Sequence, residues 1–305
     1  MKNKQAVVTV IGNYAVGMTM ECQDFPQAGE TVKGHNFRRL HGGKGSNQAI
    51  CTARLGARTI FGGCFGKDSF GDDALAMMRD EGMDITHILR TDKDATGVGL
   101  VWVAASGNNE IVIGLGAAEH FMPGDVDAML GAIKGSDILL LQLEMNLDSV
   151  AHAIEVAHGA GVPVILNPAP FSKIPDEYLR QVTYLTPNET EAAAMLGLDA
   201  IPDGADLARR LHATYGGTAV VTLGEKGAYV KSATIDEAVP GVKVEAVDTT
   251  GAGDTFSGAL AVGLGEGMEL LDAVRFATRA AALSVTVKGV VESIPYRKQV
   301  DGMKP

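Results

Sequence analysis

The chain has 305 residues, of which 46% are hydrophobic and 21% charged, a composition typical of a folded globular protein. Its 26 Lys and Arg residues against 37 Asp and Glu residues give a formal net charge of −11, so no surplus of cations is present to bind nucleic acid. No apolar run reaches the roughly 18 residues of a membrane span, and three cysteines without CxxC spacing predict free thiols and a cytoplasmic location.

Strand-like and helix-like segments alternate along the chain. In chain order, strands are expected at 7–11, 59–61, 137–142, 162–166 and 219–223. Helices are expected at 46–55, at 72–81, from Asp148 or Ser149 as N-cap, from Asn188, from Ala252 and at 270–287. Nearly continuous apolar strands between amphipathic helices predict an α/β fold, with a mostly parallel sheet sandwiched by helices, in one domain over residues 1–305.

One region departs from this alternation. Two β-rich runs at 97–103 and 110–115 are joined by Ala-Ser-Gly-Asn-Asn, which predicts a hairpin. The segment 19–37 is punctuated by Gly and Pro and is partly β-like. We expect segments of about 13–37 and 95–116 to form a small sheet that stands off the main one and acts as a lid or an interface.

The segment Val-Asp-Thr-Thr-Gly-Ala-Gly-Asp-Thr-Phe-Ser-Gly at 247–258 has the strongest chemical character. Gly251, Ala252 and Gly253 lie at the expected start of a helix, where free backbone N–H groups favour an anion. Asp254 follows in the first turn, where a carboxylate can take a proton from a hydroxyl, although such a residue also stabilises a helix start by itself. The segment is neither a Walker A loop nor a GxGxxG fingerprint, which argues against a dehydrogenase.

A second Gly-rich segment, His-Gly-Gly-Lys-Gly-Ser-Asn-Gln, occupies positions 41–48. Its glycines permit close approach of the backbone to a ligand. Lys44 and Asn47 offer side-chain donors beside them. The alternative interpretation is a Gly-rich turn with a solvated lysine.

Two further segments allow both a structural and a functional interpretation. Asn188 and Glu191 have the spacing of a capping box, or they bind Mg²⁺ on nucleotide phosphates through water. Thr-Leu-Gly-Glu-Lys-Gly at 222–227 follows a buried strand, where α/β folds bind ligands, but it also suits an ordinary turn between strands.

Together and in this order, these segments resemble the landmarks of the ribokinase family of carbohydrate kinases, the PfkB group. The resemblance covers nearly the whole chain and is carried by GGKGSNQA, LLLQLE, LNPAP, PNETEA, TLGEKG and DTTGAGDTFSGAL. It implies a helix-covered sheet with a small β lid that covers the sugar and often mediates homodimer formation. It also implies ATP-dependent transfer of a phosphoryl group to a primary hydroxyl of a sugar, with Mg²⁺ and a monovalent cation such as K⁺.

The resemblance implies a role for each matching residue. Asp254 would be the general base, and the backbone amides of Gly251, Ala252 and Gly253 would form an anion hole. Sugar contacts are implied for Gly42, Gly43, Lys44, Asn47 and Glu144. Contacts with Mg²⁺, phosphate or nucleotide are implied for Asn188, Glu191, Thr222, Gly224, Gly227 and Thr278. The monovalent cation is implied beside Asp248, Thr250, Ser284, Val287, Gly289 and Ser293.

One departure from the family pattern concerns the sugar. The family usually has Asn-x-Asp just after the first strand, and alignment through Gly12 leaves Ala15 and Gly17 at those positions. Loss of a charged acceptor to a hydroxyl costs about 1.5–3 kcal/mol, or roughly one to two decades in affinity. Besides ribose, a deoxypentose, a ketose or a nucleoside therefore stays open as substrate. A catalytically silent sugar- or nucleotide-binding regulator is a further alternative, against which the intact Asp254 argues.

Overall fold

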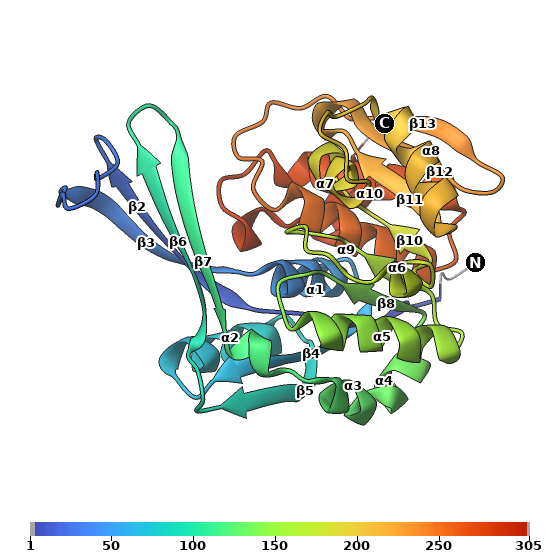
Figure 1. Cartoon of the computed structure of the whole chain (residues 1–305), viewed down its shortest axis with the longest axis horizontal. Coiled ribbons are helices and arrows are strands. Elements are labelled where there is room, and N and C mark those ends of the chain that lie inside the picture. The colour runs from blue at the N-terminus through green and yellow to red at the C-terminus, as the bar shows by residue number, and fades with distance from the viewer. Residues whose placement is uncertain (1–3, 304–305) are drawn as a thin grey trace.

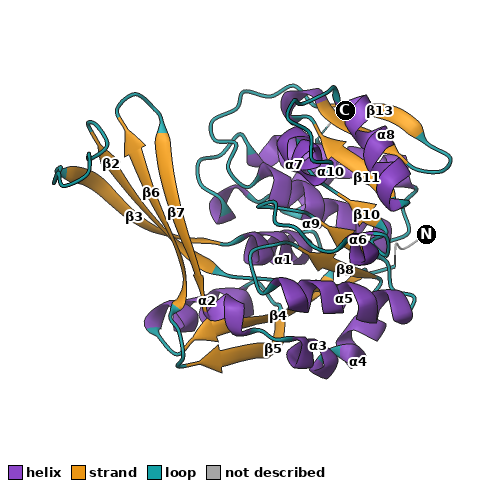
Figure 2. Cartoon of the chain, viewed as in Figure 1, coloured by secondary structure: helices purple, strands orange, loops and turns teal. Residues whose placement is uncertain are grey.

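The computed structural model describes residues 4–303, and its main sheet has nine strands (Figure 1 and Figure 2). The strand order is β13-β12-β11-β10-β9-β8-β1-β4-β5. Their bounds are β1 (Val7–Ile11), β4 (Arg58–Gly66), β5 (Asp84–Thr91), β8 (Ile138–Leu141), β9 (Val164–Leu166), β10 (Tyr184–Leu185), β11 (Thr218–Thr222), β12 (Gly227–Lys231) and β13 (Asp236–Pro240). Pairing is parallel from β5 to β11, and β12 and β13 add an antiparallel edge. The predicted α/β class is confirmed.

Helices cover both faces of this sheet. One face packs against α1 (Lys44–Arg54), α2 (Ser69–Asp80), α9 (Ala252–Gly265), α10 (Leu270–Ser284) and α11 (Arg297–Gly302). The other packs against α3 (Pro123–Ala128), α4 (Leu130–Lys134), α5 (Leu147–Gly159), α6 (Asp176–Leu179), α7 (Glu189–Met195) and α8 (Gly204–Tyr215). Within residues 4–303, no helix combines the length and the apolar character needed to cross a bilayer.

The apolar strands supply two separate cores because successive side chains of a strand point to opposite faces. In β8, Ile138 and Leu140 belong to the core beneath α9, while Leu139 and Leu141 belong to the core beneath α5. All four are buried, so this strand has no solvent face. The run of consecutive apolar residues is therefore required by a strand that is covered on both sides.

A second, four-stranded sheet stands away from the helix-covered body (Figure 1). This lid sheet consists of β2 (Ala15–Cys22), β3 (Gly34–Gly42), β6 (Thr96–Ala104) and β7 (Asn109–Gly116), in the order β3-β2-β6-β7. The predicted hairpin is confirmed as β6 and β7. Strand β3 continues to Gly42, beyond the expected end at residue 37, because it pairs with β2 as far as Ala15. The Gly-rich segment therefore begins at the end of a lid strand.

Four predicted helix boundaries differ from the structure by two or more residues. Helix α2 begins at Ser69 rather than residue 72, because Asp68 is its N-cap and accepts a hydrogen bond from the Gly71 amide at 2.8 Å. Helix α1 begins at Lys44 rather than residue 46, because Gly43, with φ +95°, turns the chain directly out of β3. The expected N-cap at Asp148 or Ser149 is wrong, since Asn146 caps α5 and its side chain accepts from the Ser149 amide at 3.0 Å. Helix α10 ends at Ser284 instead of residue 287.

Arg54 at the end of α1 ties the C-terminal segment to the body. Its guanidinium donates to the carbonyls of Val291 and Ile294 at 2.6 and 2.9 Å, and it pairs with Glu81. The Arg54 side chain is only 10% exposed. We expect Arg54→Met to lower the free energy of unfolding by about 3–5 kcal/mol, because removing one partner leaves a buried charge without its counterion. Urea denaturation measures the change.

An exposed ion pair provides the matched control. Arg209 pairs with Asp236 at 3.0 Å, but its side chain is 52% exposed. Arg209→Met should therefore change the free energy of unfolding by less than about 1 kcal/mol. Equal decreases in the free energy of unfolding in the two variants would contradict the proposal that Arg54 stabilises the fold through its buried contacts.

Candidate active site

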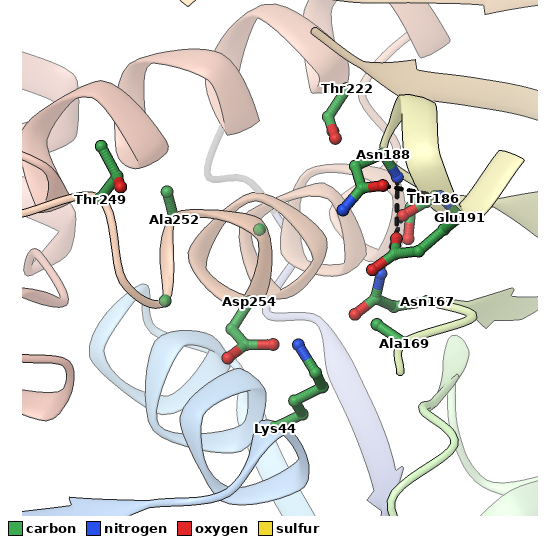
Figure 3. Close-up of a pocket in the computed structure, with 12 residues that line it drawn as sticks. Lys44, Asn167, Ala169, Thr186, Asn188, Glu191, Thr222, Thr249, Ala252 and Asp254 are labelled. Atoms are coloured by element: carbon green, nitrogen blue, oxygen red, sulfur yellow. Dashed lines mark hydrogen bonds between the residues drawn. The ribbon is translucent and has the colours of Figure 1, made fainter. Parts of the chain in front are cut away.

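A pocket of about 160 Å³ opens where three parallel strands of the main sheet end (Figure 3). Asn167 follows β9, Thr186 follows β10 and Thr222 ends β11, so their side chains meet at one edge of the sheet. The starts of α1 and α9 complete the wall. The lining residues are Lys44, Asn167, Ala169, Thr186, Asn188, Glu191, Thr222, Thr249, Gly251, Ala252, Gly253 and Asp254.

Asp254 lies in the first turn of α9, as predicted, and is only 5% exposed. Asn47 Nδ2 donates to Asp254 Oδ2 at 2.8 Å, and Gln48 Nε2 donates to Asp254 Oδ1 at 3.0 Å. Both donors come from α1, which packs tightly on α9 because Gly258 has no side chain. A Cβ at Gly258 would lie 2.8 Å from the Cβ of Cys51.

The ammonium group of Lys44 points toward the Asp254 carboxylate (Figure 3). The negative charge of Asp254 raises the pKa of Lys44, although burial of the lysine opposes the shift. The backbone amide of Lys44 donates to Glu144 Oε2 at 2.9 Å. The predicted sugar residues Lys44, Asn47, Glu144 and Asp254 therefore come together around the start of α1.

Several buried polar atoms in this region have no hydrogen-bond partner among the described residues. They include Asn13 Nδ2 and Asn47 Oδ1. Burial raises the pKa of Glu144, against the hydrogen bond from the Lys44 amide. Buried donors and acceptors without partners are costly, so a ligand that carries hydroxyl groups would complete this arrangement.

The segment from Gly251 to Gly253 forms the turn into α9. Gly251 has φ +78°, a conformation that disfavours any residue with a side chain. A Cβ there would also lie 2.7 Å from Val290 Cγ1. The first amides of α9 follow directly, which makes this turn suited to bind an anion.

Asn188 and Glu191 form the predicted capping box at the start of α7. Each side chain accepts a hydrogen bond from the other residue's backbone amide, at 2.8 Å in both cases. The second Glu191 oxygen and the Asn188 side-chain nitrogen point into the pocket (Figure 3), and burial raises the pKa of Glu191. The structural interpretation of these residues is thus confirmed, and the same side chains also line the pocket.

The residues expected around a monovalent cation lie on three adjoining segments. Asp248 Oδ1 accepts from the amide and hydroxyl of Thr250 at 3.0 and 2.7 Å, and Asp248 Oδ2 accepts from the Gly289 amide at 3.0 Å. Despite burial, these hydrogen bonds hold the pKa of Asp248 below its ordinary value. The Val287 amide donates to the Ser284 carbonyl at 3.3 Å, and the Ser293 hydroxyl donates to the Val290 carbonyl at 2.8 Å.

Asn47, Glu144 and the six residues expected around the cation are outside the lining of this pocket. Five further predicted residues do not line it either: Gly42, Gly43, Gly224, Gly227 and Thr278. The first two end β3 and precede α1, and the next two flank the turn between β11 and β12. Thr278 lies buried in α10, where its hydroxyl donates to the Val274 carbonyl at 2.9 Å.

Five residues that line the pocket or contact Asp254 were not predicted: Gln48, Asn167, Ala169, Thr186 and Thr249. Asn167 could have been predicted, because it is a polar residue that directly follows an apolar strand, in the segment LNPAP. Thr249 belongs to the segment at 247–258, but nothing in the sequence distinguishes it from its neighbours there. Its place in the pocket depends on how the loop before α9 folds back.

Comparisons with known proteins identify the family of this chain. A family model described as pfkB family carbohydrate kinase matches residues 7–297. A ribokinase of Haemophilus influenzae is 39% identical over 294 residues, which cover 96% of each chain. A deoxyribokinase of Salmonella typhi is 34% identical over 295 residues, again 96% of each chain. A solved structure of Arabidopsis thaliana ribokinase complexed with ribose and ATP has a TM-score of 0.88 at 33% identity, and covers 97% of this chain and 98% of that one.

The family model matches nearly the whole chain, and the curated relatives are matched along nearly all of their length. Both sheets and the helices on their faces are thus part of the similarity, which extends well beyond a single motif. This chain is therefore a carbohydrate kinase of the pfkB family.

Proposed function

We propose that this kinase transfers the γ-phosphoryl group of ATP to a primary hydroxyl of a pentose, either ribose or 2-deoxyribose. The observation that carries the proposal is the position of Asp254. Its carboxylate is held by two amide donors and lies one residue beyond the Gly251–Gly253 turn. A proton acceptor and an anion site are thus adjacent, as phosphoryl transfer to an alcohol requires. The names of the two curated relatives support the choice of sugars.

In the proposed reaction, Asp254 accepts the proton of the sugar hydroxyl, and the hydroxyl oxygen of the sugar attacks the γ-phosphorus. A new O–P bond forms, the bond between the γ-phosphorus and the bridging oxygen breaks, and ADP leaves with that electron pair. The backbone amides of the Gly251–Gly253 turn stabilise the negative charge on the transferring group. Lys44, whose ammonium faces the carboxylate, stabilises the same charge during transfer.

Glu191 is proposed to hold Mg²⁺ through water, since its free carboxylate oxygen fits an ion that keeps several waters and takes few protein ligands. The Asn188 side-chain nitrogen is a hydrogen-bond donor, and it is proposed to donate to a phosphate oxygen beside that ion. Mg²⁺ bound there would neutralise charge on the nucleotide phosphates. Thr222, which ends β11 in the pocket wall, is proposed to contact the nucleotide.

The choice between the two pentoses depends on the start of β2. Ala15 is buried, and Gly17 pairs with Gly99 of β6, so no carboxylate lies at this end of the strand. A Cβ at Gly17 would meet only the Leu40 carbonyl oxygen, at 3.7 Å, so the backbone leaves room for a side chain. With one carboxylate fewer than the family pattern, the site should discriminate weakly between ribose and its 2-deoxy form.

Turnover of ATP against D-ribose, 2-deoxy-D-ribose, fructose and nucleosides tests the proposal. We expect similar kcat/KM for the two pentoses, and Gly17→Asp should favour ribose by about ten-fold or more, because a carboxylate then accepts from a ribose hydroxyl. Gly17→Asn is the matched control without charge. Failure of every sugar, with ATP still bound, would instead indicate a silent binding protein.

The cation site gives a separate prediction. If Asp248 and the Gly289 segment hold K⁺, replacing a bulky organic cation with K⁺ should raise kcat. Asp248→Asn should weaken that response about ten-fold or more in K⁺ concentration, because one ligand loses its charge. Turnover measured across K⁺ concentrations provides the test, and a flat response of the unaltered enzyme would contradict the site.

We also propose that the lid sheet mediates a homodimer. Met20, Leu100, Trp102 and Val112 lie on one face of this sheet by their strand register, and each is more than a third exposed. A contiguous apolar face of this kind favours association with a partner. Light scattering should give twice the chain mass of 31.8 kDa, and a monomer mass would contradict the proposal.

A further inference from the structure

We infer that Gln48 is a positioning residue that fixes the orientation of the Asp254 carboxylate. The inference rests on the proposed function in one respect, namely that Asp254 acts as the general base. The hydrogen bonds that carry it join side chains of α1, of α9 and of the segments after β8 and β9.

The side chain of Gln48 is completely buried, and each of its polar atoms has a partner. Its Nε2 donates to Asp254 Oδ1 at 3.0 Å and to Asn167 Oδ1 at 3.1 Å, which uses both hydrogens. Its Oε1 accepts from Gln142 Nε2 at 2.6 Å. The amide therefore has no freedom to rotate without losing hydrogen bonds.

A hydrogen bond to a backbone carbonyl fixes which way the side-chain amides of Asn167 and Gln48 point. Asn167 Nδ2 donates to the Thr186 carbonyl at 2.9 Å, so Asn167 Oδ1 must face Gln48. Because Asn167 presents an acceptor, Gln48 must present its donor. A reversed Gln48 amide would place Oε1 against Asn167 Oδ1 and Asp254 Oδ1, three oxygens without a hydrogen between them.

The two amides of Asn47 and Gln48 are the side chains that donate to Asp254 among residues 4–303. Charged or titratable groups also surround the carboxylate: Lys44 and Cys51 from α1, Glu144 after β8, and Glu191 from α7. A neutral amide holds a carboxylate in place without being able to give it a proton. Gln48 thus orients Asp254 and leaves its remaining lone pairs free for the substrate hydroxyl.

Two substitutions of Gln48 separate positioning from simple packing. Gln48→Glu keeps the shape but places a second carboxyl group against Asp254, and two carboxyl groups in contact resist double ionisation. We expect the acid limb of the pH profile of kcat/KM to move up by about one pH unit or more. Gln48→Met removes the hydrogen bonds at similar volume, and kcat should fall about ten- to a hundred-fold with little change in the KM for ATP.

Thr52→Val is the matched control. Thr52 is also completely buried on α1, and its hydroxyl donates to the Ala49 carbonyl at 2.8 Å without touching Asp254. This variant should keep kcat within about twofold and leave the pH profile in place, because the Thr52 hydroxyl bonds only the Ala49 carbonyl and the Thr59 hydroxyl and has no hydrogen bond to the Gln48 network among the described residues. If Thr52→Val matches Gln48→Met in kcat, the loss reflects core packing and the inference is wrong.

A second measurement does not depend on sugar turnover. In protein labelled with ¹³C at aspartate Cγ, the signal absent from Asp254→Asn identifies Asp254, and its pH titration can be followed. Its midpoint should be higher in Gln48→Glu than in the unaltered chain, and an unmoved midpoint would overturn the inference. If no sugar is phosphorylated, the proposed function fails, while this titration still decides the role of Gln48.

Discussion

Asp254→Asn is expected to lower kcat by about 10²–10⁴-fold, the usual contribution of a general base, while ATP still binds. An asparagine has nearly the same shape but takes up no proton from the sugar hydroxyl. It also accepts hydrogen bonds at only one end, so either Asn47 or Gln48 would then face an amide nitrogen. Turnover with the best pentose and calorimetric titration with ATP measure the two effects separately.

Asp272→Asn is the matched control for this substitution. Asp272 also lies in the first turn of a helix, α10, but its side chain is 65% exposed and, among residues 4–303, pairs only with Arg275. It shares the helix-start position of Asp254 without the pocket, so its variant should keep kcat. An unchanged kcat in Asp254→Asn would remove the general-base assignment, whatever the control shows.

The second large effect is expected at Gly251. Gly251→Ala places a Cβ 2.7 Å from Val290 Cγ1 and forces alanine into φ +78°. Either the turn or Val290 must move, which displaces the amides that are proposed to bind the transferring phosphoryl group. Loss of one such donor typically lowers kcat by about 10²–10³-fold. Steady-state turnover at saturating pentose and ATP measures the loss.

Gly267→Ala distinguishes this effect from backbone strain alone. Gly267 follows the other end of α9, has φ +84°, and a Cβ there meets no atom within 4 Å. The same left-handed strain of roughly 1–2 kcal/mol should lower stability but leave kcat unchanged. Adding Val290→Ala to Gly251→Ala should restore part of the turnover, since it removes the contacting methyl group. An unchanged kcat in Gly251→Ala would show that the amides of this turn do not stabilise the transferring phosphoryl group.

Much of the fold could be predicted because strands and helix starts depend on short sequence patterns, such as apolar runs and capping residues. Within the run at 137–142, the four positions 138–141 are all apolar, and a strand covered on both faces requires this. Asn188 and Glu191 form the predicted capping box because its hydrogen bonds join residues only three apart. Helix starts were less certain, since Asn146 rather than Asp148 or Ser149 caps α5 and all three residue types serve as caps.

The α/β class, the lid hairpin and the order of the polar segments were predictable from the sequence, because each depends on residues near one another along the chain. The assembly of the site was not predictable, because it joins segments that are far apart in the chain. Asp254 accepts from Asn47 and Gln48 across separations of 207 and 206 residues, and Asn167 meets Gln48 across 119. These contacts arise because parallel strands deliver their carboxyl ends to one edge and because Gly258 lets α1 approach α9, and no local pattern encodes such distances.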